Sequence, residues 1–382
     1  MIGLFLLRFE RAEQAERRIA GAAVAAHLAA LADKAGAHDI RIVTANDVPL
    51  KAKAWDDVRR ACPSARFDGY EGAPAVSVSG RMLVAPDALR DFAESGAETL
   101  IWRGQPVARK AAAPGTGSLL IEDDEAVSCD DRDAAERWLL RRTSKPGDGI
   151  VSRRINRPIS QTISRYLLRI DGIRPWHMTV VTALFAMAMI VALVSSGYGA
   201  LIAAGLLFHA ASVIDGVDGE IARASYRSSA AGATLDTSVD MATNVSFYLG
   251  FTLAMARLYG FRVEMLGGCT LGLALLGLGI MAWLARRTGQ HGFDFLKRFY
   301  TTRFAAGFPR VIIDSFITIM SRDFFAFAWA LLILFRAPLV ITYGLSFFSL
   351  LWVVLMLIAA PALLRESGEP ASGRLALGRG SP

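Results

Sequence analysis

Long apolar segments run through the second half of the chain, and they restrict the possible folds more than any other feature. Several approach the about 20 residues that a helix needs to cross a bilayer. The segments lie at residues 177–196, 199–222, 232–258, 264–285, 322–337 and 338–363. We therefore predict an all-α transmembrane domain of six helices over residues 176–365. The short fifth segment and the sixth can also be read as one long hairpin.

The first 142 residues have the mixed, partly charged composition of a soluble domain. Strands and helices alternate along them, which is typical of an α/β domain with a largely parallel sheet. We expect strands at 2–9, 39–47, 81–86, 98–102, 106–111 and 117–123, and helices at 10–36, 54–61, 87–93 and 130–142, with Asp87 as a helix cap.

Arginines cluster at the ends of the apolar segments and predict the orientation of the membrane domain, because positive residues favour cytosolic loops. Arginines at 153–174, 223–227, 286–310 and 365 would lie on one side, and Arg257, Arg262 and Arg336 on the other. Both termini are then expected in the cytosol, with the chain in the inner membrane. This explains the formal net charge of +7 without a nucleic-acid partner.

Residues 143–175 join the two parts and contain apolar side chains spaced three and four apart. These are Ile155, Ile159, Ile163, Tyr166 and Leu167, with arginines between them. The pattern favours a basic amphipathic helix in the plane of an anionic membrane surface. The alternative is a surface helix packed on the soluble domain. Residues 366–382 are expected to form a disordered tail.

Carboxylates are concentrated where the second and third apolar segments meet. On a helix, Asp215, Asp218, Gly219 and Ala222 would share one face, with Arg223 at its edge. Gly232, Asp236 and Asp240 follow at intervals of four and would form one stripe on the next helix. The connection between these helices is short and polar, so they should be antiparallel neighbours whose acidic stripes meet.

Four facing carboxylates repel one another unless cations lie between them. Oxygen ligands alone favour hard ions such as Mg²⁺ or Mn²⁺. Two such ions suit a diphosphate, whose charge they neutralise, and Arg223 can add charge-assisted bonds to phosphate. The alternative is that these aspartates only cap helix ends, but capping does not require two acidic pairs at helical spacing.

The pattern D-x-x-D-G-x-x-A-R, eight residues, then G-x-x-x-D-x-x-x-D resembles the signature of the CDP-alcohol phosphotransferases, and the layout of residues 145–365 is similar to that family. The resemblance implies transfer of a phosphoalcohol group from a CDP-alcohol to an acceptor hydroxyl with release of CMP, in phospholipid or polyol-phosphate synthesis. It also implies a homodimer.

The resemblance further implies roles for individual residues. Asp215, Asp218 and Asp236 would bind metal, and Asp240 would bind metal and act as general base. Gly219, Ala222, Arg223, Ser229 and Thr179 would contact the CDP group. The family often has asparagine where this chain has Trp176, so this position departs from the family pattern.

The acceptor is less clear from the sequence. Arg310 and Arg322 are candidates for binding an acceptor phosphate, and they can equally be topology signals. Residues 145–160 resemble a subgroup that has an N-terminal sugar-phosphate cytidylyltransferase-like domain. In that subgroup CDP-inositol and inositol phosphate can be the substrates.

A working domain of that type needs a glycine-rich phosphate loop after its first strand, and residues 6–23 contain none. We therefore interpret residues 1–142 as a degenerate nucleotidyltransferase-like domain without activity, in which Asp87 is at best a remnant metal position. Two alternatives remain open, a bifunctional enzyme that also makes its own CDP-alcohol and a cation transporter. A transporter does not account for Gly219, Ala222 and Arg223.

Overall fold

The computed structural model describes residues 2–67, 76–110, 117–145, 147–288, 300, 311, 315, 318–319 and 321–368. It divides into two compact units. The first contains Met1–Asp148, Ile155–Val181 and Val213–Thr237, and the second contains Gly149–Arg154, Thr182–Ser212 and Ser238–Pro382. The first unit therefore joins the α/β domain to one end of the long helices. The domain bounds expected from the sequence stay a prediction.

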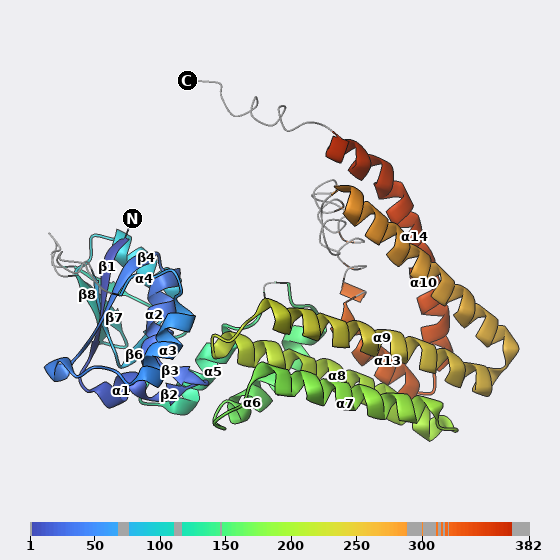
Figure 1. The fold of residues 1–382 in the computed structure, drawn as a ribbon, viewed down its shortest axis with the longest axis horizontal. Coiled ribbons are helices and arrows are strands. Elements are labelled where there is room, and N and C mark those ends of the chain that lie inside the picture. The colour runs from blue at the N-terminus through green and yellow to red at the C-terminus, as the bar shows by residue number, and fades with distance from the viewer. Residues whose placement is uncertain are drawn as a thin grey trace. The chain divides into compact units, whose positions relative to one another are not determined.

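A six-stranded mixed sheet forms the centre of the α/β domain (Figure 1). Its order is β4 (Ala37–Thr44), β1 (Ile2–Phe9), β5 (Val76–Ser79), β8 (Gln105–Lys110), β7 (Thr99–Trp102) and β9 (Ser118–Leu120). Strand β1 is parallel to β4 and β5, but β8 is antiparallel to both neighbours. The expected largely parallel sheet is thus only partly right. The β7–β8 turn has positive φ at Arg103 and Gly104, which favours a tight hairpin over a crossover.

In the part of the α/β domain that the structure describes, five α-helices and two small strand pairs surround this sheet. They are α1 (Ala12–Glu16), α2 (Val24–Lys34), α3 (Ala52–Ala61), α4 (Pro86–Glu94) and α5 (Arg132–Arg141), with β2 (Arg18–Ile19) paired to β3 (Ala22–Ala23) and β6 (Met82–Val84) paired to β10 (Ala126–Ser128). Asp131 caps α5 by accepting from the Ala134 N–H. Asp87 does not cap α4: it lies in the first turn, and Ala85 is the N-cap residue.

The helix expected over residues 10–36 is interrupted, which corrects the prediction from its alanine-rich pattern. The β2–β3 hairpin separates α1 from α2. Asp57, on α3, is buried and holds this hairpin. Its Oδ2 accepts from Arg18 Nη1 at 2.8 Å and from the Ala23 N–H at 3.1 Å. Asp57 lies more than thirty positions further along the chain than Ala23. Local helix propensity therefore cannot predict this interruption.

His27 lies on the buried face of α2, and burial lowers its pKa to about 4. An unfolded histidine titrates near about 6.5, so the unfolded chain binds the proton more readily. We expect this histidine to reduce the free energy of unfolding by up to about 3 kcal/mol as the pH falls from about 6.5 to 4. Urea unfolding followed by tryptophan fluorescence should show this fall in the unaltered chain and a smaller one in His27→Gln. Parallel pH profiles for both chains would contradict the expectation.

The α/β domain shares its core with one end of the helical region. Leu168, Met178, Val217, Ile221 and Ala224 belong to the same cluster of buried side chains as the strands. They come from three successive stretches, α6 (Arg157–Leu167) with the residue after it, α7 (Pro175–Val194) and α8 (Tyr198–Ala224). This continuous core explains why the first unit extends beyond residue 148.

Helix α6 presents a polar face to α8. Ser160 and Ser164 are buried, whereas Ile159 and Tyr166 are exposed and Ile163 is partly buried against the core. The helix therefore packs against the rest of the first unit through one side and leaves apolar side chains exposed on another. Its expected place in a membrane surface stays a prediction.

The described elements of the second unit are all helices. It contains the remaining parts of α7, α8 and α9 (Ala230–Tyr259), with α10 (Phe261–Thr288), α13 (Arg322–Leu334) and α14 (Pro338–Gly368). Aromatic rings form much of its core: Phe208 stacks on Phe247 with centroids 4.1 Å apart, and Phe325 lies 4.6 Å from Trp329. Helices α10 and α14 run side by side (Figure 1).

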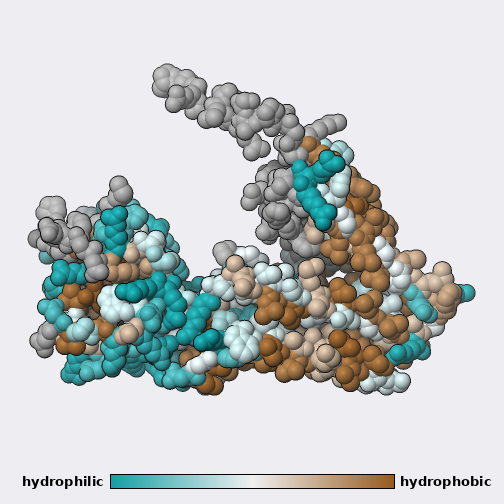
Figure 2. Space-filling model, in the orientation of Figure 1, coloured by the Kyte–Doolittle hydropathy of each residue, from teal (hydrophilic) through white to brown (hydrophobic). Residues whose placement is uncertain are grey.

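Four of the described helices are long and apolar enough to cross a membrane. They are Pro175–Val194, Tyr198–Ala224, Phe261–Leu284 and Pro338–Ala362. Apolar residues cover much of the helical part in Figure 2, and hydrophilic residues cover the α/β part. Helix α9 is also long enough but carries Asp236 and Asp240, and α13 has only 13 residues. An α/β domain followed by a helical membrane domain is thus confirmed, and a count of six spans stays a prediction.

Candidate active site

The first acidic pair lies near the end of α8. Asp218 is 6% exposed, and its Oδ2 accepts from Thr179 Oγ1 on α7 at 2.9 Å. Thr179 was expected to contact CDP; here its hydroxyl orients a carboxylate. Asp215 lies one turn earlier on α8 and is half-buried. Because α8 is long and apolar enough to cross a membrane, both carboxylates lie near the end of a candidate membrane helix and not in a loop.

The second acidic pair lies on α9. Ser229 Oγ accepts from the Gly232 N–H at 3.0 Å, so Ser229 caps the start of this helix. Asp236 and Asp240 follow one turn apart. The predicted acidic stripe is therefore present on a regular helix, and Ser229 has a structural function besides any contact with CDP.

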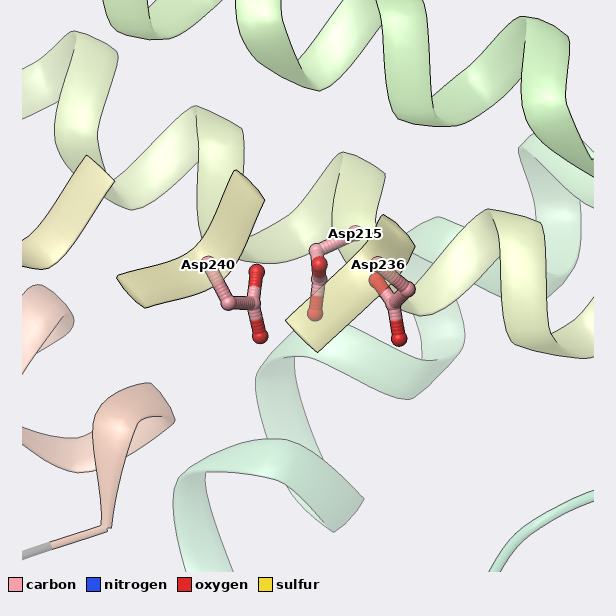
Figure 3. A group of neighbouring side chains, drawn as sticks. All are labelled: Asp215, Asp236 and Asp240. Atoms are coloured by element: carbon pink, nitrogen blue, oxygen red, sulfur yellow. The ribbon is translucent and has the colours of Figure 1, made fainter. Parts of the chain in front are cut away.

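Three of the four predicted aspartates come together. Asp215, Asp236 and Asp240 each offer a carboxylate oxygen, and these oxygens all lie within 4.8 Å of one another (Figure 3). Asp218 is not part of this group, but its carboxyl contacts that of Asp236 and accepts from Thr179. Among the described residues, the buried Asp236 Oδ1 has no hydrogen-bond partner. Three carboxylates this close, one of which has a buried oxygen without a hydrogen-bond partner, fit a hard divalent cation.

Asp240 also has a cationic neighbour. Arg322, the first residue of α13, donates from Nη1 to Asp240 Oδ1. The next residue, Asp323, accepts from Ser212 Oγ on α8 at 3.0 Å. Arg322 was predicted to bind an acceptor phosphate, and the structure pairs it with the predicted general base. Arg310, the other candidate, lies outside the described residues.

Arg223 folds back along α8 across Gly219. A Cβ at Gly219 would lie 2.9 Å from Arg223 Nη1, so the missing side chain makes room for the guanidinium. Arg223 Nε donates to the Thr143 carbonyl at 2.9 Å. Ala222, also predicted to contact CDP, is half-buried beside it. The Arg223 guanidinium thus lies against the backbone of Gly219, the residue that follows Asp218.

Sequence reasoning missed a buried carboxylate between these residues. Glu220 is 0% exposed and accepts from Ser160 at 2.7 Å, Ser164 at 2.6 Å and Arg157 at 2.9 Å. Arg157 also donates to Asp148 at 2.8 Å. The sequence did contain a signal: an acidic residue in an apolar helix requires a partner. The arginines of the preceding amphipathic helix were the nearest candidates for that partner.

The fold and site together define a class, a membrane protein with clustered carboxylates on two successive helices. Comparison with known proteins gives the family: the CDP-alcohol phosphatidyltransferase model matches residues 173–363, half of the chain. The chain belongs to the CDP-alcohol phosphatidyltransferase family.

The chain is also similar to curated proteins named bifunctional IPC transferase and DIPP synthase. That of Aquifex aeolicus is 31% identical over 184 residues, 48% of this chain and 40% of the relative. That of Thermococcus kodakarensis is 41% identical over 114 residues, 30% of this chain and 25% of the relative. That of Rubrobacter xylanophilus is 31% identical over 195 residues, 49% and 42% of the two chains. The chain therefore spans less than half the length of each relative.

Proposed function

We propose that this protein transfers a substituted phosphate group from a CDP-alcohol to an acceptor hydroxyl and releases CMP. The observation that carries the proposal is the cluster of Asp215, Asp236 and Asp240 within a chain of this family. In the reaction, the acceptor oxygen forms a bond to the β-phosphorus of the donor, and the bond from that phosphorus to the CMP oxygen breaks.

Each residue of the site is assigned a role in this reaction. We assign Asp240 as the general base that takes the acceptor proton, and Arg322 holds one of its carboxylate oxygens. Arg223 and Gly219 are assigned to the CDP group, because a guanidinium beside a glycine suits a diphosphate. Asp215, Asp218 and Asp236, with Asp240, would hold Mg²⁺ or Mn²⁺, and a bound ion supplies charge neutralisation at the diphosphate.

For the substrates we propose an inositol-phosphate type of donor and acceptor, because residues 145–160 resemble the subgroup in which CDP-inositol and inositol phosphate can be the substrates. A bifunctional enzyme that also makes the donor from CTP is the second candidate, favoured by the word bifunctional in the names of the relatives. Against it, the segment after β1 forms the β2–β3 hairpin instead of a glycine-rich loop. The arginine distribution supports a site on the cytosolic side.

The proposal is tested with the purified full chain in Mg²⁺. We expect CMP release with one or more members of a panel of CDP-alcohols and acceptors, identified by mass spectrometry of the products. EDTA should stop the release and Mn²⁺ should restore it. As a readout independent of turnover, Mn²⁺ binding followed by electron paramagnetic resonance should be lost in Asp236→Asn. Metal binding without CMP release from any donor would argue for a cation transporter instead.

The same preparation decides between one activity and two. With CTP and inositol phosphate as the only substrates, we expect no release of pyrophosphate. Pyrophosphate release would establish the bifunctional alternative and would overturn the interpretation of residues 1–142 as inactive.

A further inference from the structure

The turn that ends α8 contains a tyrosine where helices usually have a glycine. The Arg227 N–H donates to the Ala222 carbonyl at 2.8 Å, and the Tyr226 N–H donates to the Arg223 carbonyl at 3.4 Å. This pair of bonds is the Schellman motif, whose left-handed residue is most often glycine. Tyr226 occupies that position with φ +57°. A residue with a side chain is unfavourable in this left-handed conformation, so contacts of Tyr226 must compensate for the strain of the turn.

The Tyr226 side chain makes such a contact with the α/β domain. Its hydroxyl lies 3.0 Å from His27 Nδ1, and His27 Nε2 lies 2.7 Å from the Ile19 carbonyl oxygen. A carbonyl only accepts, so the ring proton is on Nε2, and Nδ1 accepts from the tyrosine hydroxyl. All three residues belong to the first compact unit. The bond therefore ties strand β2, helix α2 and the end of α8 together.

The tip of the β2–β3 hairpin packs against the same turn. Gly21 has φ +83°, and a Cβ there would lie 2.6 Å from Leu168 Cδ2 and 3.3 Å from Ser225 Cβ. Only glycine meets both the backbone conformation and this close approach. Arg227 Nη1 also donates to the Ile173 carbonyl at 3.1 Å. Backbone and side-chain contacts thus hold residues 225–227 from several directions.

We propose that the α/β domain positions the CDP-binding end of α8, and that Tyr226 and His27 are positioning residues for the transferase. The inference rests on the proposed function, because it assumes that Arg223 binds CDP. The Arg223 carbonyl accepts from the Tyr226 N–H, so a displaced turn shifts the residue that carries this guanidinium. The hairpin occupies the segment after β1 and serves as a docking element for the membrane domain.

The test compares three variants of the full chain in Mg²⁺, with CMP as the probe because every CDP-alcohol shares it. Tyr226→Phe removes the bond to His27. Tyr226→Gly removes it too but relaxes the backbone. Tyr198→Phe is the matched control, since it removes one tyrosine hydrogen bond, to the Ile333 carbonyl at 2.6 Å, at the other end of α8.

We expect the dissociation constant of CMP to rise about three- to tenfold in Tyr226→Phe, the loss that one hydrogen bond gives. For the donor that the panel of CDP-alcohols identifies, the KM should rise by a similar factor, while kcat and the KM of the acceptor stay within about twofold. Tyr226→Gly should be at least as impaired, and Tyr198→Phe should match the unaltered chain. Gly21→Ala, at the tip of the β2–β3 hairpin that packs against this turn, should raise the dissociation constant of CMP by a similar factor.

Three results would overturn the inference. The first is an unchanged affinity for CMP in Tyr226→Phe. The second is normal affinity in Tyr226→Gly, which would show that only the backbone of the turn matters. The third is an equal loss in kcat and in both KM values, which indicates general damage to the fold. If the unaltered chain neither binds CMP nor releases it, the proposed function itself fails, and that outcome is separate from these three.

Discussion

Asp240→Asn is expected to lower CMP release by about 10²–10⁴-fold, the contribution typical of a positioned general base. Asparagine has nearly the shape of aspartate and keeps an oxygen for the N–H of Arg322, but it cannot take the proton of the acceptor hydroxyl. Binding of the CDP-alcohol should remain largely intact. Turnover and donor binding are measured on the same purified protein.

A control for this prediction is Glu264→Gln, which neutralises an exposed carboxylate near the start of α10. It should turn over at the rate of the unaltered chain. Full turnover by Asp240→Asn would remove Asp240 as the base. A variant that has also lost donor binding would show that the carboxylate acts mainly in assembling the site.

Glu220→Leu should destabilise the packing of α6 on α8 by about 1–3 kcal/mol, because it leaves buried donors without their acceptor. Arg157 is 11% exposed in its side chain and has Glu220 on one side and Asp148 on the other. Ser160 and Ser164 would also lose their acceptor. Amide hydrogen exchange over residues 157–167 and the thermal midpoint in detergent measure the effect.

A double variant makes this prediction specific. Replacing a buried ion pair by apolar residues is often nearly neutral, but Asp148 also loses its partner when Arg157 is replaced. Arg157→Met combined with Glu220→Leu should therefore recover only part of the lost stability. Asp148→Asn, which leaves the Arg157–Glu220 bond in place, should have a smaller effect than Glu220→Leu. Unchanged exchange in Glu220→Leu would mean that the apolar contacts of α6 hold it without the ion pair.

Much of the site is local in the chain and was therefore predictable. The spacing of Asp215 and Asp218, and of Asp236 and Asp240, sets their helix faces because a helix has a fixed period. A short polar connection makes α8 and α9 successive helices with adjacent ends. The meeting of Asp215 with Asp236 follows from these two facts.

Other contacts join residues that are distant in sequence, and these were missed. His27 and Tyr226 are 199 positions apart, Arg322 and Asp240 are 82 apart, and Arg157 and Glu220 are 63 apart. Each partner alone has an ordinary explanation, as a helix residue, a topology signal or a solvated charge. The interrupted helix at 10–36 has the same cause, since Asp57 lies on another helix.

The amino-acid sequence by itself determined the two-part architecture and the acidic faces of α8 and α9, because hydrophobic length and helical period depend only on the order of residues. The tertiary structure alone decided which partners the buried polar groups have. A buried carboxylate, imidazole or phenol needs a hydrogen-bond partner, but only packing decides which one it meets. For this reason Glu220 joins Arg157, Asp240 joins Arg322, and Tyr226 joins His27.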